Sequence, residues 1–461
     1  MSFKPYPKYK ESGVEWLGRV PEHWEVNRFK WSVSSCRNGI WGDEAKGDEN
    51  DIPCVRVADF DRQRLRVELA EPTIRNISTT ERQGRVLERG DLLLEKSGGG
   101  ELNPVGCVVL YDDAASAICS NFIARMRLKS EADSSFCRYL HSAAYAVRLN
   151  VRSIKQTSGI QNLDQQQYLD ERATFPPLAE QQVVGAFLDR ETAKIDALIA
   201  EQQRLIELLQ EKRQAVISHA VTKGLNPDAP MKDSRIEWLG EVPEHWEVVR
   251  LKNLVRSRNG IQMGPFGGML KELEHEPTPY KLFGQQNTIN DDFDVGQRWL
   301  TEACFCSLKE YELLPGDLVL TRKGASIGYC RVVPDGISKG IIDSDTIRVR
   351  VVPERISNAF AVSLMQEGYL EKEILYRQKG SVLPGLNSSV ISNLSLALPP
   401  PHEQAAICHR IVTVSEEIDG LCDSAQHSIA LLQERRSALI SAAVTGQIDV
   451  RGFSGGGSEA A

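Results

Sequence analysis

Short clusters of basic and amide side chains are the parts of this 461-residue sequence best suited to chemistry. Arg250, Lys252 and Arg256 begin one such run, which reaches Arg258 without an acidic residue. Guanidinium and ammonium groups neutralise phosphates, which gives affinity for nucleic acid without reading its sequence, whereas Arg, Asn and Gln can hydrogen-bond base edges. The clusters therefore favour DNA binding, although any one basic residue taken alone is more often part of a solvated surface.

Sixteen residues are the candidates for contact with DNA. They are Asn38, Lys96, Ser97, Arg148, Arg152, Lys155, Gln156, Gln161, Arg256, Arg258, Asn259, Arg322, Lys323, Arg377, Lys379 and Ser381. Asn162, Gln262 and Gln378 are further amides that could meet base edges. The net charge of −8 opposes this interpretation. Because local fields govern encounter, the positive charge would have to gather on one face of each globular unit.

Several motifs of nucleotide-dependent and metal-dependent enzymes are missing. The sequence has no Gly-x-x-x-x-Gly-Lys-Ser/Thr, His-Glu-x-x-His or Asn-Pro-Pro-Tyr/Phe. Its Cys and His residues are scattered, with no Cys-x-x-Cys, which argues against a zinc site and for reduced thiols. No apolar run approaches 18 residues, so no transmembrane helix is expected. We therefore expect a cytoplasmic, non-catalytic chain that binds no metal or cofactor itself.

Two long helices, over residues 180–222 and 403–445, are predicted to position these clusters. Each begins with Glu-Gln shortly after a run of prolines, and the two copies align without a gap. Their apolar residues recur at alternating intervals of about four and three, which predicts an antiparallel coiled coil between two globular units. The alternative is that each helix packs only on its own domain. The predicted pairing residues are Ile195, Leu198, Leu205, Leu209, Val216, Ile418, Leu421, Leu432 and Leu439.

A tryptophan-rich motif also occurs twice, over 12–26 and 234–248, where both copies contain EWLG followed by VPEHWEV. A repeat this dense indicates two tandem units of one design. Bulky aromatic residues flanked by Leu and Val usually serve packing, so we expect the motif to clasp each domain to its helix. The alternative, in which Trp16 and Trp24 stack on bases, requires both side chains to be exposed.

Both globular units are predicted to be mixed α/β with many short strands. Two further segments are repeated between them. The RNGI tetrapeptide at 37–40 returns at 258–261, and the Gly-Asp loop at 90–98 is answered by the one at 316–324. Strands are predicted at 107–111, 123–128, 317–321 and 346–351, and helices at 136–147 and 360–376. Outside these segments the two units diverge, as expected of one architecture with two targets.

Taken together and in order, these motifs resemble the specificity subunit of type I restriction–modification systems, from about residue 9 to 448. The resemblance implies two α/β target-recognition domains separated by the paired helices. The expected divisions are an N-terminal segment 1–25, target-recognition domain 1 at 26–175, a central helix 176–225, a linker with the second tryptophan motif 226–247, target-recognition domain 2 at 248–398, a C-terminal helix 399–448, and a disordered tail 449–461.

The resemblance also implies a division of labour. Each domain would read one half of a split target in double-stranded DNA, and the helices would set the spacer. Two methyltransferase subunits would bind S-adenosylmethionine and methylate a flipped adenine, and motor-nuclease subunits would use ATP and Mg. An interaction scaffold without nucleic acid is the main alternative, and it would suit the acidic net charge. A stand-alone nuclease or methyltransferase is disfavoured by the missing motifs.

Overall fold

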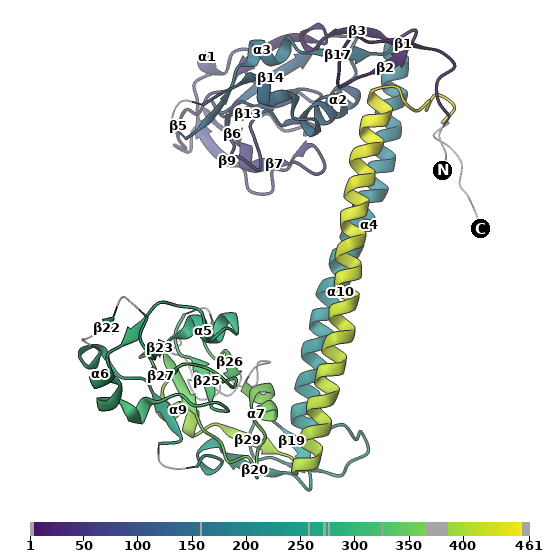
Figure 1. Ribbon diagram of the computed structural model, residues 1–461. Helices are drawn as coiled ribbons and strands as arrows, with labels where there is room; N and C mark the ends of the chain where they lie inside the picture. The colour runs from purple at the N-terminus through teal and green to yellow at the C-terminus, as the bar shows by residue number, and fades with distance from the viewer. Residues whose placement is uncertain are drawn as a thin grey trace. The chain divides into compact units, whose positions relative to one another are not determined.

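A computed structural model describes residues 4–156, 159–256, 259–270, 273–274, 277–324, 326–365 and 386–453 (Figure 1). The chain divides into two compact units: unit 1 comprises Met1–Arg204 and Ala425–Ala461, and unit 2 comprises Leu205–Ser424. Four candidate residues, Arg258, Arg377, Lys379 and Ser381, lie outside the described residues, as do Gln378 and the second part of the helix predicted at 360–376. Within the described ranges, no helix combines the length and apolar character needed to cross a membrane.

Unit 1 is built on a six-stranded sheet in the order β4–β14–β10–β12–β8–β7. Its strands are Val33–Asn38, Ile123–Leu128, Leu92–Glu95, Val108–Leu110, Arg66–Val67 and Phe60–Asp61. A four-stranded sheet contains β13 (Ile118–Cys119), β6 (Asp51–Val55), β9 (Thr73–Asn76) and β5 (Asp43–Glu44). A third sheet joins β11 (Ser97–Gly98), β16 (Gln161–Leu163) and β15 (Ile154–Gln156). Unit 1 also contains two two-stranded pairs: β1 (Tyr9–Glu11) with β2 (Arg19–Pro21), and β3 (Glu25–Arg28) with β17 (Arg172–Phe175). Its short helices include α1 (Thr79–Arg82) and α3 (Gln165–Leu169).

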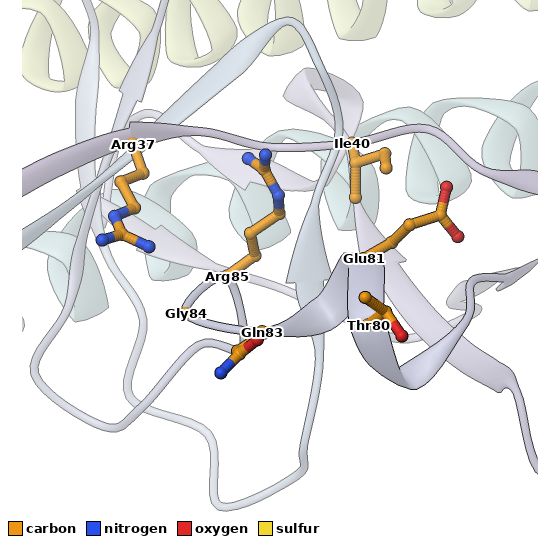
Figure 2. Close-up of a pocket in the computed structure, with 7 residues that line it drawn as sticks. All are labelled: Arg37, Ile40, Thr80, Glu81, Gln83, Gly84 and Arg85. Carbon is orange, nitrogen blue, oxygen red and sulfur yellow. The ribbon is translucent and has the colours of Figure 1, made fainter.

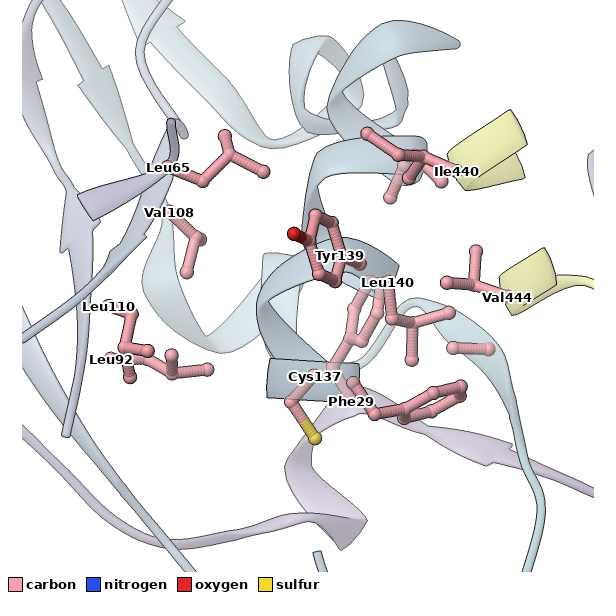
Figure 3. Close-up of a cluster of buried hydrophobic side chains, with 14 of the residues drawn as sticks. Phe29, Leu65, Leu92, Val108, Leu110, Cys137, Tyr139, Leu140, Ile440 and Val444 are labelled. Carbon is pink, nitrogen blue, oxygen red and sulfur yellow. The ribbon is translucent and has the colours of Figure 1, made fainter. Parts of the chain in front are cut away.

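Helix α2 (Ser134–Ala146) provides the core of unit 1. Asp133 caps it by accepting from the backbone N–H of Phe136, so the helix starts where the sequence supplies a capping side chain. Figure 3 shows Tyr139 and Leu140 of α2 between sheet residues and the end of the C-terminal helix. Strand β10 is buried along its whole length, which explains its unbroken apolar run.

Unit 2 repeats this plan with two four-stranded sheets. One orders β21 (Ile261–Met263), β28 (Thr346–Val349), β25 (Leu318–Thr321) and β26 (Cys330–Val332), and the other orders β22 (Leu273–Glu274), β24 (Trp299–Leu300), β23 (Tyr280–Phe283) and β27 (Lys339–Ile342). Two-stranded pairs join β18 (Met231–Asp233) to β19 (Glu241–Pro243) and β20 (Glu247–Arg250) to β29 (Ser395–Leu398). Its short helices are α5 (Gln285–Asn290), α6 (Glu302–Ser307), α7 (Asn358–Met365) and α9 (Ser388–Ser392).

The two long helices are α4 (Leu178–Lys223) and α10 (Pro401–Val444), and each unit contains part of both. In unit 1, the start of α4 shares a buried cluster with the end of α10, and Asp196 further along α4 pairs with Arg436. In unit 2, Leu209 of α4 packs with Val414 and Ile418, while the end of α4 shares a cluster with the start of α10. The helices therefore pair in antiparallel fashion within each unit, as predicted.

The buried seam differs in detail from the predicted one. Leu198, Leu205 and Leu421 are 45%, 42% and 53% exposed, so their assignment to the seam is wrong. Buried Ile199 and half-buried Ile206 occupy the seam instead, each one position after a predicted leucine. Ile195, Leu209 and Ile418 are buried as predicted, and Val216, Leu432 and Leu439 are half-buried.

The tryptophan motif is the clasp that the packing interpretation predicts. Trp24 is fully buried, and its indole N–H donates to Glu180 in the first turn of α4 (3.1 Å), which also contacts His23. In unit 2, Trp246 is fully buried and donates to Glu403 in the first turn of α10 (2.9 Å). Because Trp24 has no exposed surface, it cannot stack on a base.

The chain after α10 is ordered as far as Phe453, so the predicted disorder of 449–453 is wrong. The backbone N–H of Asp449 donates to the carbonyl of Lys4 (2.8 Å), and Val450 is buried. The Phe453 ring packs edge-on against Phe187. These contacts hold residues 449–453 against unit 1. The Gly- and Ser-rich composition of the residues that follow had suggested disorder for the whole segment.

Candidate nucleic-acid interface

The Gly-Asp motifs form the buried frame of the candidate interface in both units. Asp91 is 3% exposed and accepts a hydrogen bond from the Arg127 guanidinium (3.1 Å), and Asp317 is 2% exposed and accepts one from Arg350 (2.6 Å). Hydrogen bonding to these carboxylates raises the pKa of both arginines. The two aspartates therefore hold two strands of each central sheet together, and neither carboxylate faces a ligand.

Strand register aligns the two units residue by residue. In unit 1, Arg37 of β4 lies opposite Arg125, whose guanidinium is buried and donates to the carbonyl of Val86 (2.7 Å). In unit 2, Gln262 of β21 lies opposite Arg348, which is equally buried and donates to the carbonyl of Glu312 (2.6 Å). Burial lowers the pKa of Arg125 and of Arg348. Arg37 and Gln262 therefore occupy equivalent positions.

This register corrects the RNGI echo of the sequence. The segment 258–261 precedes the true equivalent of 37–40, and the carbonyl of Asn259 serves a different purpose, accepting from Arg348 (3.0 Å). The equivalent glycines are Gly39 and Gly264. An added Cβ would lie 2.0 Å from the carbonyl oxygen of Cys119 at the first and 1.9 Å from that of Asp343 at the second. Only glycine permits the chain to cross a neighbouring strand so closely at these two places.

An exposed aromatic ring follows the crossing glycine by two residues in each unit. Trp41 is 39% exposed, and the Arg75 guanidinium lies 4.5 Å from its ring centroid. Phe266 is 54% exposed, and Arg322 lies 5.5 Å from its centroid. The aromatic positions are equivalent, whereas the arginines differ in origin: Arg75 belongs to β9 and Arg322 directly follows β25. Each unit thus presents an aromatic side chain with an arginine beside it at the same corner.

Four arginines of unit 1 form what we call the arginine edge: Arg37, Arg75, Arg82 and Arg85. None of them forms an ion pair with a carboxylate of a described residue. Arg75 donates to the carbonyls of Trp41 and Gly42, Arg82 to those of Ile77 and Glu49, and Arg85 to that of Asn38. Since these contacts leave the positive charges uncompensated, this edge is a local cationic surface on an acidic protein.

An open cavity of about 500 Å³ lies at this edge between β4 and the turn after α1. Figure 2 shows Arg37 reaching from the strand towards the turn that carries Gln83 and Gly84, and Arg85 reaching back towards the strand. Glu81 also lines the cavity, but Ser78 donates to its carboxylate through both backbone N–H and hydroxyl. These hydrogen bonds lower the pKa of Glu81. The Glu81 carboxylate is thus held by the helix cap rather than by the arginines.

The structure brings Asn38 to this edge, and it leaves a second predicted residue of unit 1, Lys96, without a charged partner among the described residues. The backbone carbonyl of exposed Asn38 accepts from Arg85 (2.6 Å). The half-buried Lys96 bonds through its backbone N–H to the carbonyl of Phe122, whose side chain is 47% exposed. No described residue pairs with the Lys96 ammonium group, so this charge is also available.

Other predicted residues of unit 1 are committed elsewhere. Ser97 of β11 donates to Asn162 of β16 (2.6 Å) and so links two paired strands. Gln161 accepts from the backbone of Val105 (3.2 Å) and so holds the loop before β12. Lys155 pairs with Asp164 (2.6 Å) and lowers its pKa. Arg152 lies 3.9 Å from Glu15, and exposed Arg148 has a left-handed backbone at the end of α2 (φ 57°). Gln156 belongs to β15, and its side chain lies outside the described part.

The predicted residues of unit 2 are similarly divided. Arg322 donates to the carbonyls of Leu386 (2.7 Å) and Ser344 (2.8 Å), so its charge remains uncompensated by a direct carboxylate bond. Lys323 pairs with Asp345 (2.6 Å) and lowers the pKa of that carboxyl. Exposed Arg256 donates its backbone N–H to the carbonyl of Arg350.

Sequence reasoning missed most of the arginine edge. Arg75, Arg82 and Arg85 are separated in the sequence by acidic and neutral residues, and only the tertiary fold brings β9, α1 and the turn after α1 together with β4 and Arg37. One signal was available, since an aromatic residue followed by Gly occurs two positions after a glycine in both units, as GIWG and GPFG.

Comparisons with known proteins identify the wider relationship. No protein-family model matches the chain. The putative type I restriction enzyme MjaX specificity subunit of Methanocaldococcus jannaschii is 22% identical over 447 residues, covering 96% of this chain and 98% of the relative. The MjaVIII specificity subunit of the same organism is 25% identical over 458 residues, covering 96% and 97%.

Chains of solved type I R-M structures have a similar fold. A chain from a structure describing assembly and conformational transition of a type I R-M system superposes with a TM-score of 0.67 at 16% identity, covering 93% of this chain and 99% of that one. The HsdS subunit of Thermoanaerobacter tengcongensis gives 0.51 at 15% identity, covering 93% and 98%. The chain is therefore a distant homologue of the specificity subunits of type I restriction enzymes and has the HsdS fold.

Proposed function

We propose that this chain is the DNA-reading subunit of a type I restriction–modification complex and carries out no chemistry itself. Each unit reads one half of a split target, and the paired helices hold the two readings at a set spacing. The observation that carries the proposal is the register of the two units. One buried frame is repeated, while partly or fully exposed positions around it differ: Arg37 is equivalent to Gln262, Trp41 to Phe266, and Lys96 to Arg322.

The cationic arginine edge supports DNA as the ligand. Its four guanidinium groups lack carboxylate partners among the described residues, so they can neutralise phosphates despite the net charge of −8. A scaffold without nucleic acid would gain nothing from such a cluster, and the homologues do not favour that alternative.

Exposed leucines on the helices support docking of two partner subunits. Leu198 and Leu421 are equivalent in the two helix copies, as are Leu208 and Leu431, and all four are between 45% and 53% exposed. Unit 1 therefore presents one leucine from each pair, and so does unit 2. Two copies of one methyltransferase subunit could use such equivalent surfaces. On this proposal, S-adenosylmethionine belongs to those subunits, and ATP and Mg belong to the motor-nuclease subunits.

Genome-wide mapping of methylated adenines tests the proposal in cells carrying this chain and its methyltransferase partner. The expected result is a bipartite motif of two half-sites with a fixed spacer. Exchanging residues 26–175 for another specificity subunit's domain should change one half-site and leave the other. Unchanged half-sites after the exchange, or methylation without a bipartite motif, would refute the proposal.

The helix spacing has its own test. A segment of whole heptads added to both α4 and α10, near Gln202 in the first, should lengthen the spacer and keep both half-sites. A spacer of unchanged length would contradict the role of the helices as the measuring element.

A further inference from the structure

Arg37 is set apart from the other arginines at its edge because its hydrogen-bond donors are free. Arg75, Arg82 and Arg85 all spend guanidinium N–H groups on backbone carbonyls. No described residue accepts a hydrogen bond from the Arg37 guanidinium or pairs with it. An arginine that only strengthens a fold would have such partners, whereas one that recognises a ligand keeps its planar fork of donors available.

The surroundings of Arg37 hold it in place without using its donors. Its backbone is fixed by pairing of β4 with β14, directly before the crossing glycine Gly39. Its guanidinium lies over Gly84, where an added Cβ would come within 2.4 Å of Nη1. Exposed Gln83 and half-buried Arg85 flank it in the same open cavity (Figure 2). A positioned side chain with free donors at a groove mouth is the arrangement that reading a base edge requires.

The equivalent position in unit 2 carries Gln262, a residue of different hydrogen-bonding character. Arginine forms paired hydrogen bonds with O6 and N7 of guanine, and glutamine does so with N6 and N7 of adenine. Neighbouring positions in the two frames are more alike, with Arg125 answered by Arg348 and Gly39 by Gly264. The two units thus differ, as Arg37 and Gln262, at a position where two DNA-binding domains with different target sequences are expected to differ.

We infer that Arg37 reads a guanine in the half-site bound by unit 1, and that Arg37 and Gln262 are equivalent specificity-determining positions of the two units. This inference rests on the proposed function and adds to it the residue and the base that it recognises.

Methylation mapping with the complete complex tests the inference through Arg37→Gln and Arg37→Lys. Arg37→Gln should lower the preference for one guanine in one half-site by roughly tenfold or more and favour adenine there. Arg37→Lys keeps the charge but loses the fork, so it should relax the same position with an unchanged salt dependence of DNA binding. The matched control is Arg172→Gln, an exposed arginine of β17 away from the cavity, which should leave both half-sites as they are.

Three outcomes would overturn the inference, and they differ in meaning. If both Arg37 variants keep every base preference of the wild-type chain, Arg37 reads no base while the proposed function stands. If they reduce methylation equally at all sequences, Arg37 contacts only phosphate. If the wild-type complex itself yields no bipartite motif, the proposed function fails together with the inference. The exposed position of Arg37 and the conservative lysine variant keep loss of folding from masking the result.

Discussion

One ion pair occurs twice in the helix pair, in two different environments, and this allows its contribution to stability to be predicted. In unit 1, Arg436 of α10 pairs with Asp196 of α4, with 2.9 Å between Nε and Oδ1. In unit 2, Arg213 of α4 pairs with Asp419 of α10. The ungapped alignment of the two helix copies makes these the same pair with the helices exchanged. The Arg436 and Asp196 side chains are 10% and 12% exposed, whereas Arg213 and Asp419 are 29% and 65% exposed.

Replacing the arginine by methionine removes the charge and keeps most of the apolar stem. Removing one partner of a fully buried pair costs about 3–5 kcal/mol. Asp196 retains some exposure and a hydrogen bond from Gln63 (3.3 Å), so we expect Arg436→Met to cost about 2–3 kcal/mol. Arg213→Met leaves Asp419 largely in water, and the expected cost is about 1 kcal/mol or less.

Native-state hydrogen exchange of the helix peptides measures both costs separately, because it reports local opening within each unit. Arg436→Met should lower the opening free energy in the unit 1 parts of α4 and α10, and Arg213→Met should affect the unit 2 parts only slightly. Equal losses in the two units, or a larger loss for Arg213→Met, would refute the reasoning from burial.

Three further predictions concern the buried frame. Gly39→Ala should destabilise unit 1 by roughly 1–3 kcal/mol, because the added Cβ would clash with the Cys119 carbonyl. Gly100→Ala has open space around the added Cβ and should be nearly neutral, and thermal unfolding of the two variants measures the difference. Burial lowers the pKa of His141 to about 3, so the fold favours its neutral form and the unfolded chain takes up a proton below about pH 6.5. Stability should therefore fall as pH drops below that value, by up to about 1.4 kcal/mol per pH unit, and His141→Gln should flatten the profile measured between pH 7 and 5. Glu180→Gln should lower the free energy of unfolding by about 1–3 kcal/mol, because Glu180 is 8% exposed and accepts three hydrogen bonds. The same change at the more exposed Glu403 should lower it less, and chemical denaturation measures both losses.

The sequence by itself determined the tandem design. The ordered repeats show two copies of one unit, and a proline run followed by a long amphipathic pattern predicts each long helix to within a few residues. The strand over 123–128 also matches, because a short alternating run carries its own periodicity. The buried role of Trp24 follows from the same local reasoning, since large aromatics flanked by aliphatic residues usually pack.

Only the tertiary structure decided which residues face a ligand and which are engaged internally. Ser97 and Gln161 look like free polar groups in the sequence, yet the fold gives each an internal partner, Asn162 on the paired strand and the backbone of Val105. Arg75 and Arg82 look unremarkable and become part of a cationic edge. The physical reason is that the partners of a side chain lie on strands far apart in the sequence, so the strand register decides whether that side chain is free to bind a ligand. The register makes Gln262, and not Arg258, the counterpart of Arg37.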